Sequence, residues 1–443
     1  MSLFTITLGA TLVGTLTGGI CSLMPSLHIY NVAGIALLLW TFLGDKMPFA
    51  AIGPFFISMI VAFSFLNAIP MTYFGAPDES ATVTILPGTK YLMNGKGHEA
   101  VMLSGIGGLC GVALLAALTP FFFYIFPYMH SIMSVHMHWI LGLVMVYMLM
   151  SEWPKGCGLG HSVWERLTTA WANLFAGIIT FGLSAILGLI ITSKSIITHE
   201  MGFQNIMPVF VGLFAIPSII QSLLSEQKVP KQHVGTTVEL ARGELGKSTF
   251  AGGLGGMLAA YLPAVTAGIG GILAGHATAS RGDRIFIIGG GVAKVIYYVG
   301  AFLFLFVLTP LSPFGLGKGG LNIILKPVFS PEVGDYALML SVIIVSGCLS
   351  FLVLLKASGW VARIMPKVDL HRLYWGALVM ILAIVGGLTG GAGLFVLAVA
   401  SCIGTIPVFY HCRRSNCMAV LLVPICLNMA GYGDTITQLL GLI

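Results

Sequence analysis

Two short stretches of this chain place polar residues where an apolar segment is interrupted. In the first, Pro25 ends a helix because it cannot donate a backbone hydrogen bond. The residues that follow carry hydroxyl, imidazole and amide groups: Ser26, His28, Tyr30 and Asn31. They stand at the start of the next half-helix, whose N-terminal N–H groups favour negative charge. We therefore predict anion binding, the alternative being that His28 and Asn31 only satisfy backbone groups that the proline leaves free.

The second interruption follows Pro263, which lies 238 residues after Pro25. Thr266 and several glycines come next, so this stretch offers mainly backbone groups. Paired breaks of this kind are typical of secondary transporters, in which half-helix ends meet a substrate near the membrane midplane. We therefore predict that Pro263 and Thr266 face the first break across an anion site. A kinked helix without a ligand is the alternative for each break taken alone.

Lys294 is a third candidate, because it lies inside an apolar run. It is ten residues beyond Arg284 in the chain, which places it about 15 Å deeper on a helical rise. A lysine at mid-bilayer needs a cavity or a partner. We predict that it binds the anion, and the alternative is a salt bridge to a carboxylate on another span, for which Asp434 is a candidate.

The polar segment 69–97 is the longest interruption in the first half, and it contains Asp78, Glu79 and Thr82. These residues are predicted to line the route to the site or to take part in coupling to Na⁺ or H⁺; a solvated loop is the alternative. No carboxylate pair, Ser/His/Asp set, phosphate-binding motif or zinc spacing is present in the sequence. An enzyme is therefore not expected, and neither is a cofactor or a bound metal.

Composition indicates where these residues operate. Hydrophobic residues make up 57% of the 443 residues and charged residues only 8%, and the mean hydropathy is +0.98. Such a chain is a multi-pass membrane protein surrounded by lipid. The net charge of +6 is spread over many loops, so nucleic acid is not an expected partner.

Sequence matches in the same order indicate an internal duplication. Gly14-Thr-Leu-Thr-Gly18 has a counterpart in Gly252-Gly-Leu-Gly-Gly256, and the segment from Met102 resembles the segment from Met339. Further matches pair Gly142 with Ala377 and Asn205 with Asn416. The predicted organisation is a first repeat over 1–225, a cytoplasmic linker over 226–247 and a second repeat over 248–443.

Each repeat is predicted to hold one broken segment, over 2–44 and 248–276. Apolar runs that follow are predicted to cross the membrane: 48–70, 99–128, 131–150, 167–193 and 199–225, then 285–311, 335–357, 373–390, 393–410 and 418–443. If the broken segments are re-entrant hairpins, five crossings per repeat place the two repeats in opposite orientations. The alternative of ordinary transmembrane pairs at the breaks stays open. The predicted fold class is therefore all-α and polytopic, with two inverted repeats, each a re-entrant helical hairpin plus about five transmembrane helices.

Loop charges agree with this topology. With residue 1 outside, sixteen Lys and Arg residues lie inside, four lie outside and Lys294 lies within a span. Such a bias toward the inside is the usual rule for membrane proteins. The predicted location is the cytoplasmic membrane, with both termini outside.

These motifs resemble the large membrane subunit of the tripartite tricarboxylate transporters, especially its shorter archaeal relatives. That family opens with a glycine-spaced segment leading to a Pro-Gly loop, where this chain has GTLTGGICSLMPSLHIYN. YLPAVTAGIGG is similar to the family's second Pro-Gly loop, and GAPDESATVTILPGTKYLMNGKG is similar to the family's Gly-x-Pro-Gly stretch and the polar run after it. Ser26, Ala264 and Asp78 stand where the family has glycine. The resemblance implies a small membrane subunit and a solute-binding protein as partners.

The sequence thus predicts a secondary active transporter of a small organic anion of the carboxylate class. An ion gradient would drive it, and the site between the two hairpins would be exposed to each side in turn. A translocase for an isoprenoid or polyprenyl lipid phosphate is the second hypothesis, because a phosphate headgroup suits the same helix ends. A membrane-embedded enzyme or an assembly subunit is the third. Whether the chain forms a homodimer stays open.

Overall fold

The structure is a computed structural model. It describes residues 2–24, 28–43, 48–75, 80, 85–152, 161–194, 196–198, 202–225, 228–279, 281–307, 325, 329, 332 and 334–442, and every regular element within these ranges is helical. Five of the predicted site residues lie outside the described residues: Pro25, Ser26, Asp78, Glu79 and Thr82. Of Tyr30, only the backbone is described.

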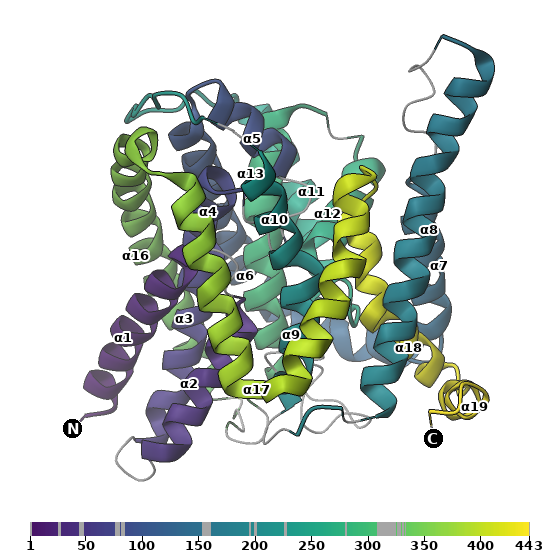
Figure 1. The fold of residues 1–443 in the computed structure, drawn as a ribbon. Helices are drawn as coiled ribbons and strands as arrows, with labels where there is room; N and C mark the ends of the chain where they lie inside the picture. The colour runs from purple at the N-terminus through teal and green to yellow at the C-terminus, as the bar shows by residue number, and fades with distance from the viewer. Residues whose placement is uncertain are drawn as a thin grey trace. The chain divides into compact units, whose positions relative to one another are not determined.

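The helices follow the predicted apolar runs (Figure 1). The first half of the chain forms α1 (Leu3–Leu23), α2 (Ile29–Leu43), η2 (Phe49–Ala51), α3 (Ile52–Leu66), α4 (Ala68–Tyr73), α5 (Ile85–Met93), α6 (Gly97–Met133), α7 (Met137–Met150), α8 (Val163–Ser193), α9 (Gly202–Phe210), η3 (Val211–Ala215) and α10 (Ile216–Leu224). The second half forms α11 (Arg242–Tyr261), α12 (Ala267–Ala277), α13 (Asp283–Val295), η4 (Ile296–Gly300), α14 (Ala301–Leu303), η5 (Phe304–Phe306), α16 (Asp335–Ile364), η6 (Met365–Lys367), α17 (Leu370–Phe409), η7 (Arg414–Met418), α18 (Ala419–Met429) and α19 (Gly433–Leu439).

Both predicted breaks are present. In the first, α1 ends at Leu23 and α2 begins at Ile29; in the second, α11 ends at Tyr261 and α12 begins at Ala267. A third turn lies inside α17, where Gly390 has a φ of 64° that glycine adopts without strain. Its two arms match the predicted runs 373–390 and 393–410, and Figure 1 shows them folding back from the turn.

Eight helices in the described part are long and apolar enough to cross a membrane, or up to ten if each of two bent pairs is one span. The bent pairs differ from the prediction. The runs 99–128 and 131–150 were expected to cross separately, but the end of α6 turns by 85° into α7, and the 14 residues of α7 are fewer than the roughly 20 that a bilayer needs. The run 418–443 is also bent, by 115°, next to Gly431 with its φ of 79°.

The helices gather in two compact units, and each unit contains parts of both chain halves. Unit 1 contains residues 1–129, 225–262 and 266–377; unit 2 contains residues 130–224, 263–265 and 378–443. The earlier helices of each half lie in unit 1 and the later ones in unit 2. The two repeats proposed from the sequence are a different division of the chain and stay a prediction.

In unit 1 the repeated glycines bring two helix pairs into backbone contact. A side chain at any of them would overlap a main-chain oxygen of the facing helix: Gly14 faces Phe55, Gly18 faces Met59, Gly252 faces Gly289 and Gly256 faces Ala293. Because the residue numbers rise together, α1 runs parallel to α3, and α11 runs parallel to α13. The two chain halves thus repeat one packing arrangement with the same spacing.

The matched helices α6 and α16 run in opposite directions. Gly105 lies against Phe351 and Leu354, whereas Gly347, earlier in α16, lies against Val112, later in α6. If the two chain halves have opposite orientations in the membrane, matched helices such as α6 and α16 must be antiparallel. On the other side of α16, the Ser346 hydroxyl donates to the Ser58 carbonyl at 3.1 Å.

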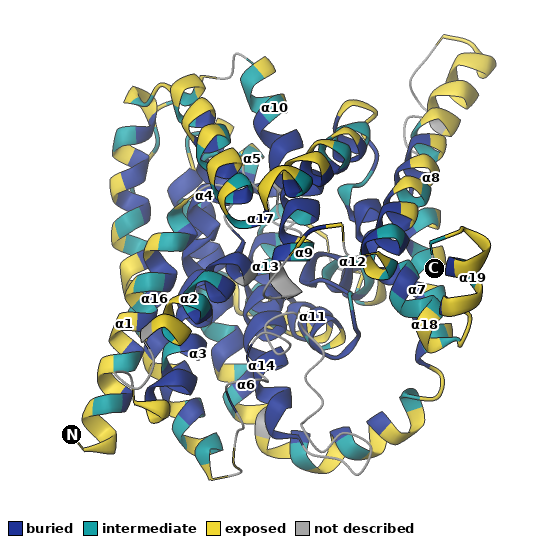
Figure 2. Cartoon of the chain, turned by 60° about the horizontal axis from the view of Figure 1, so that its bottom comes forward, coloured by how far each residue is buried: buried dark blue, intermediate teal, exposed yellow. Residues whose placement is uncertain are grey.

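Burial separates the central helices of unit 1 from those at its margin. The side chains of α3 are almost all buried, as are those of the second half of α13, while α1 exposes Leu3, Phe4 and Leu16 (Figure 2). A helix that is apolar and buried on all sides belongs to the core, whereas exposed apolar side chains of a membrane span face lipid. The helix that carries Lys294 is therefore a core element.

Unit 2 is held by close contacts and a buried carboxylate. Gly188 of α8 meets the main chain of Val420 in α18, and Gly404 in the second arm of α17 meets that of Leu213 in η3. Glu152 is fully buried and accepts hydrogen bonds from the Arg413 N–H at 2.5 Å and the Asn416 amide at 3.2 Å. These bonds fasten the end of α7 to the turn before α18.

Candidate anion-binding site

His28 begins the second half of the first broken helix. Its carbonyl accepts the N–H groups of Asn31 at 3.0 Å and Val32 at 3.2 Å, which is the first turn of α2. The His28 and Asn31 side chains are both buried. The first N–H groups of a helix have no partner within the helix, and such groups favour negative charge. His28 thus stands at the start of a helix, and its role in anion binding stays a prediction.

The His28 ring contacts Tyr298, a residue that the sequence analysis did not select. The two rings meet edge to face with their centroids 6.4 Å apart, and Tyr298 also meets Phe63 of α3 at 6.3 Å. Tyr298 lies in η4, a π-helical turn, and such turns are frequent at functional sites. The sequence could have indicated Tyr298, because it lies four residues after Lys294 and residues with this spacing share a helix face.

Lys294 is in the last turn of α13 and is only 2% exposed. It is therefore buried within the protein, while its predicted depth in the bilayer stays a prediction. One helical turn separates it from Tyr298, so Lys294 and His28 approach the same part of unit 1. Asp434, the carboxylate considered as its partner, lies exposed in the first turn of α19 and does not share these buried surroundings.

Thr266 begins the second half of the other broken helix. Its carbonyl accepts the Gly270 N–H at 2.9 Å, and its hydroxyl oxygen accepts the Ile269 N–H at 3.5 Å. The Thr266 side chain is buried, and so is Pro263 in the turn before it. Ala264 has a φ of 59°, in the left-handed region that favours glycine. Thr266 and His28 thus each stand directly before the first residue of a helix, 238 residues apart.

Helix register places Thr266 close to the level of Lys294. α12 packs against both α11 and α13. Gly275 of α12 faces the Phe286 ring of α13, which a Cβ at position 275 would approach to 3.3 Å, and a short connection joins these two antiparallel helices. Nine residues before Gly275 is Thr266, and nine residues after Phe286 is Val295, the neighbour of Lys294. The start of α12 therefore lies at the depth of the buried lysine.

The same counting applies to the helices that enter each break. Gly256 faces Ala293, so the end of α11 at Tyr261 lies level with Tyr298. Gly18 faces Met59, so the end of α1 at Leu23 lies level with Ser64, next to Phe63. Since Phe63 also contacts Tyr298, both broken helices of unit 1 end and restart at one depth.

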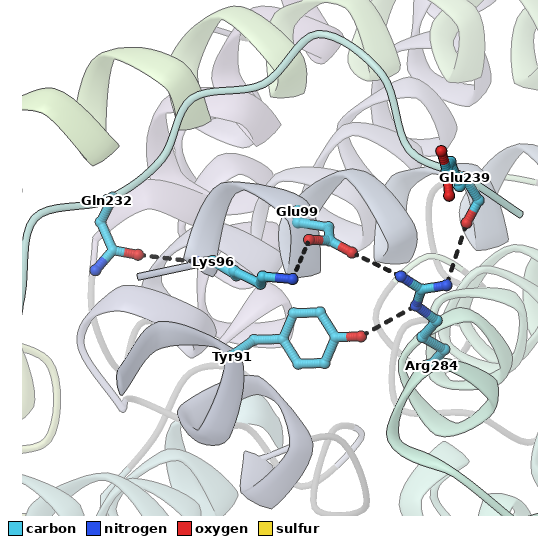
Figure 3. A network of polar contacts seen from close by, with 7 residues as sticks. Tyr91, Lys96, Glu99, Gln232, Glu239 and Arg284 are labelled. Atoms are coloured by element: carbon cyan, nitrogen blue, oxygen red, sulfur yellow. Dashed lines mark hydrogen bonds and ion pairs between the residues drawn. The ribbon is translucent and has the colours of Figure 1, made fainter. Parts of the chain in front are cut away.

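Figure 3 shows a polar network that holds the opposite end of α13. The Arg284 guanidinium donates to Tyr91 Oη, to Glu99 Oε1 and to the Glu239 carbonyl, each at 3.3 Å, and Lys96 lies 3.7 Å from Glu99. Gln232 accepts the Gly97 N–H at 2.8 Å. The segment between the chain halves is thereby tied to α5, α6 and the first turn of α13, which fixes the helix that carries Lys294.

A buried hydrogen-bonded cluster lies where α4, α6 and α16 meet. His98 Nδ1 lies 2.9 Å from the Ser358 hydroxyl, which is also 3.3 Å from Tyr73 Oη. All three side chains are buried. Buried polar groups without partners are costly, so this cluster joins the three helices in a specific arrangement.

The groups at this level have chemistry suited to an anion: the Lys294 ammonium, the His28 imidazole, the Thr266 hydroxyl and the starts of two helices. That they form one binding site stays a prediction. Among the residues that the structure describes, no three His, Cys, Asp or Glu side chains form a group that could hold a metal ion. The predicted coupling residues Asp78, Glu79 and Thr82 lie outside the described residues.

The chain matches the model of the tripartite tricarboxylate transporter TctA family over residues 8–419, and it belongs to that family. It is also similar to an uncharacterized protein of Methanocaldococcus jannaschii, with 23% identity over 421 residues, covering 93% of this chain and 96% of the relative. No solved structure matches it.

Membership of this family confirms the resemblance predicted from the Pro-Gly-like loops. The chain is an integral multi-pass membrane protein and a component of a tricarboxylate-type transporter, not a member of an enzyme family. The family works with a small membrane subunit and a solute-binding protein.

Proposed function

We propose that this chain is the membrane subunit that carries a small organic anion of the carboxylate class across the cytoplasmic membrane. The observation that supports this most is the common depth of three features in unit 1: the start of α2 at His28, the start of α12 near Thr266, and Lys294. Each of them favours negative charge, and a carboxylate has the charge and the acceptor oxygens to use all three.

Alternating access is the mechanism proposed for transport. Inverted repeats permit it because two equivalent bundles can exchange inward-facing and outward-facing arrangements around one site. The opposite directions of α6 and α16 and the repeated glycine packing of α1 on α3 and α11 on α13 support such a symmetry. In this scheme the broken segments are re-entrant hairpins, and the termini face outside.

Coupling and partners follow from the same proposal. Asp78, Glu79 and Thr82 would take part in coupling to Na⁺ or H⁺, since carboxylates and hydroxyls can bind either ion. A small membrane subunit and a solute-binding protein would deliver the anion, as in the family. The lipid-phosphate hypothesis has no support from the comparisons and is not proposed.

The direct test is uptake by proteoliposomes that contain the purified chain, with and without its partner subunits. A panel of labelled carboxylates is offered under Na⁺ and pH gradients. We expect uptake of at least one carboxylate, and we expect Lys294→Met to reduce it at least tenfold. Lys247→Met is the matched control, because Lys247 is exposed near the start of α11. If no carboxylate is taken up under any gradient or with any partner, the proposed function is wrong.

A further inference from the structure

The buried side chains of His98, Ser358 and Tyr73, here called the His98 cluster, have chemistry that the proposed anion site does not use. Resting on the proposed function, we infer that this cluster binds the proton that drives transport, with His98 as the group that takes the proton up. The coupling ion is then H⁺. Tyr73 ends α4 shortly before the segment 76–84, so the cluster adds a proton site next in sequence to the predicted coupling residues.

The His98 ring has hydrogen-bond partners on two other parts of the chain. His98 Nδ1 lies 2.9 Å from the Ser358 hydroxyl of α16. The ring also forms a hydrogen bond with the backbone of Gly235, in the segment between the chain halves. We assign this second bond to Nε2, because Nδ1 faces Ser358. His98, Ser358 and Tyr73 are at most 4% exposed, so their hydrogen bonds are made within the protein and not to bulk water.

When His98 is neutral, the hydrogen bonds of the cluster run in one direction. The Tyr73 hydroxyl donates to the Ser358 hydroxyl oxygen, 3.3 Å away, and the Ser358 hydroxyl donates to His98 Nδ1. The His98 Nε2–H donates to the Gly235 carbonyl. Each of these donors has an acceptor, as buried polar groups require.

A proton on His98 Nδ1 reverses this direction while the heavy atoms stay in place. Nδ1–H then donates to the Ser358 hydroxyl oxygen, and the Ser358 hydroxyl donates to Tyr73 Oη. The Tyr73 hydroxyl in turn donates to the Ser358 carbonyl, 3.4 Å away. A buried donor without an acceptor is costly, and neither protonation state leaves one on these three side chains. The cluster can therefore hold His98 in both protonation states, as a proton site requires.

The surroundings of His98 contain charged groups of both signs. The charged and titratable side chains near it on its own helix, on the segment between the chain halves and on α16 are Glu99 with its ion-pair partners Lys96 and Arg284, His233, and Arg363. Asp78 and Glu79, in the segment after α4, lie outside the described residues. Both hydrogen-bond patterns are available whichever of these groups are charged, and the charges set the pH at which His98 takes up its proton.

The His98 cluster lies where the two chain halves meet within unit 1. Tyr73 and His98 belong to the first half, and Ser358 belongs to the second. On the same helix as Ser358, the Ser346 hydroxyl lies 2.9 Å from the hydroxyl of Thr15 in α1. α16 therefore contacts both the His98 cluster and the helix that enters the first break. Through α16, protonation of His98 can bias how the two halves are arranged.

The number of protons that move with each carboxylate tests this proton site. Proteoliposomes loaded with a pH-sensitive dye report proton entry while a labelled carboxylate enters down its own gradient, and the ratio of the two does not depend on the rate of transport. We expect His98→Gln to lower the ratio by about one proton per carboxylate, because Gln keeps hydrogen-bonding groups but cannot take up a proton. His161→Gln is the matched control, because His161 is exposed.

Titration of the histidines by NMR in detergent measures proton binding without transport. The signal that His98→Gln lacks belongs to His98, and we expect it to titrate between about pH 4 and pH 8. Ser358→Ala removes the acceptor of the charged Nδ1–H, so it should move the midpoint of this titration to lower pH by roughly half a pH unit or more. Ser341→Ala, at an exposed position of the same helix, should leave the midpoint in place. If His98→Gln does not fold, the signal whose midpoint moves in Ser358→Ala but not in Ser341→Ala identifies His98.

The outcomes separate two kinds of failure. Uptake that moves no protons, an unchanged ratio in His98→Gln, or a set of histidine signals in which none titrates as expected for His98 overturns the proton site and leaves a carboxylate transporter in place. Absence of uptake for every carboxylate instead overturns the proposed function, and the titration then decides by itself whether His98 binds a proton.

Discussion

The two broken helices of unit 1 have the same order of helix, break and helix, but the residues that start their second helices offer different chemical groups. The first restarts at His28, whose imidazole contacts Tyr298, and it continues with the buried Asn31. The second restarts at Thr266, before a run of glycines, and its turn forces Ala264 into a left-handed conformation. The first break therefore presents side chains, and the second presents mainly backbone. If the proposed function holds, we expect the start of α2 to recognise the anion through side chains and the start of α12 to contribute mainly its backbone.

The largest effects should come from the glycines that seat each broken helix. Gly18→Leu and Gly256→Leu would each push a side chain into the facing backbone, so we expect each to destabilise the fold by about 3 kcal/mol or to prevent folding. Gly9→Leu and Gly246→Leu are matched controls, because nothing lies within 4 Å of either position. Thermal unfolding in detergent measures the difference. Equal stability of Gly18→Leu and Gly9→Leu would contradict the close packing.

Removing the side chain at the start of α2 should reduce transport more than removing the side chain at the start of α12. We expect His28→Ala to weaken carboxylate binding by 10–100-fold, which corresponds to roughly 1.4–2.8 kcal/mol, because a donor to the anion is lost. Thr266→Ala should weaken it by less than tenfold and lower stability by about 1 kcal/mol through the lost cap. Uptake kinetics and thermal unfolding of both variants give the two values. A larger transport defect in Thr266→Ala than in His28→Ala would contradict the expectation that the side chain at the start of α2 contributes more to anion binding.

We expect Tyr298 to support anion binding through the contact of its aromatic ring with His28, and not through its hydroxyl. We expect Tyr298→Leu to weaken binding by about three- to tenfold, because the edge-to-face contact with His28 contributes about 0.5–1.5 kcal/mol. Tyr298→Phe retains the ring and should remain close to the wild type. Apparent affinity for the transported carboxylate is measured, with Tyr410→Leu as a control because Tyr410 is exposed. If Phe and Leu at position 298 are equally defective, the hydroxyl matters and the ring contact does not.

The smallest expected effect on stability concerns the backbone of the turn between α11 and α12. Ala264→Gly should stabilise the protein by about 1 kcal/mol, because a left-handed conformation disfavours any side chain with a Cβ. Ala267→Gly, three residues later in the first turn of α12, should instead be neutral or destabilising. Unfolding temperatures of the two variants should therefore move in opposite directions. A lower unfolding temperature for Ala264→Gly would show that this turn is not strained.

Much of the fold was predictable because membrane spans are long apolar runs and prolines interrupt them. The breaks at Pro25 and Pro263 and the burial of Lys294 were of this kind. The bend between α6 and α7 was not, since the runs on both sides are equally apolar and hydropathy does not report direction. The departures at Ser26 and Ala264 were visible in the sequence, but the φ of Ala264 needed the backbone itself.

The sequence by itself determined the membrane class, the family, the two breaks and the presence of Lys294 well inside an apolar run. These properties depend on composition and on local backbone chemistry, which neighbouring residues decide. Tertiary structure alone decided that His28 meets Tyr298, 270 positions further along the chain, and that Thr266 lies level with Lys294. Contacts between distant segments depend on which helices pack and in which register, and here glycines that admit backbone contact set that register.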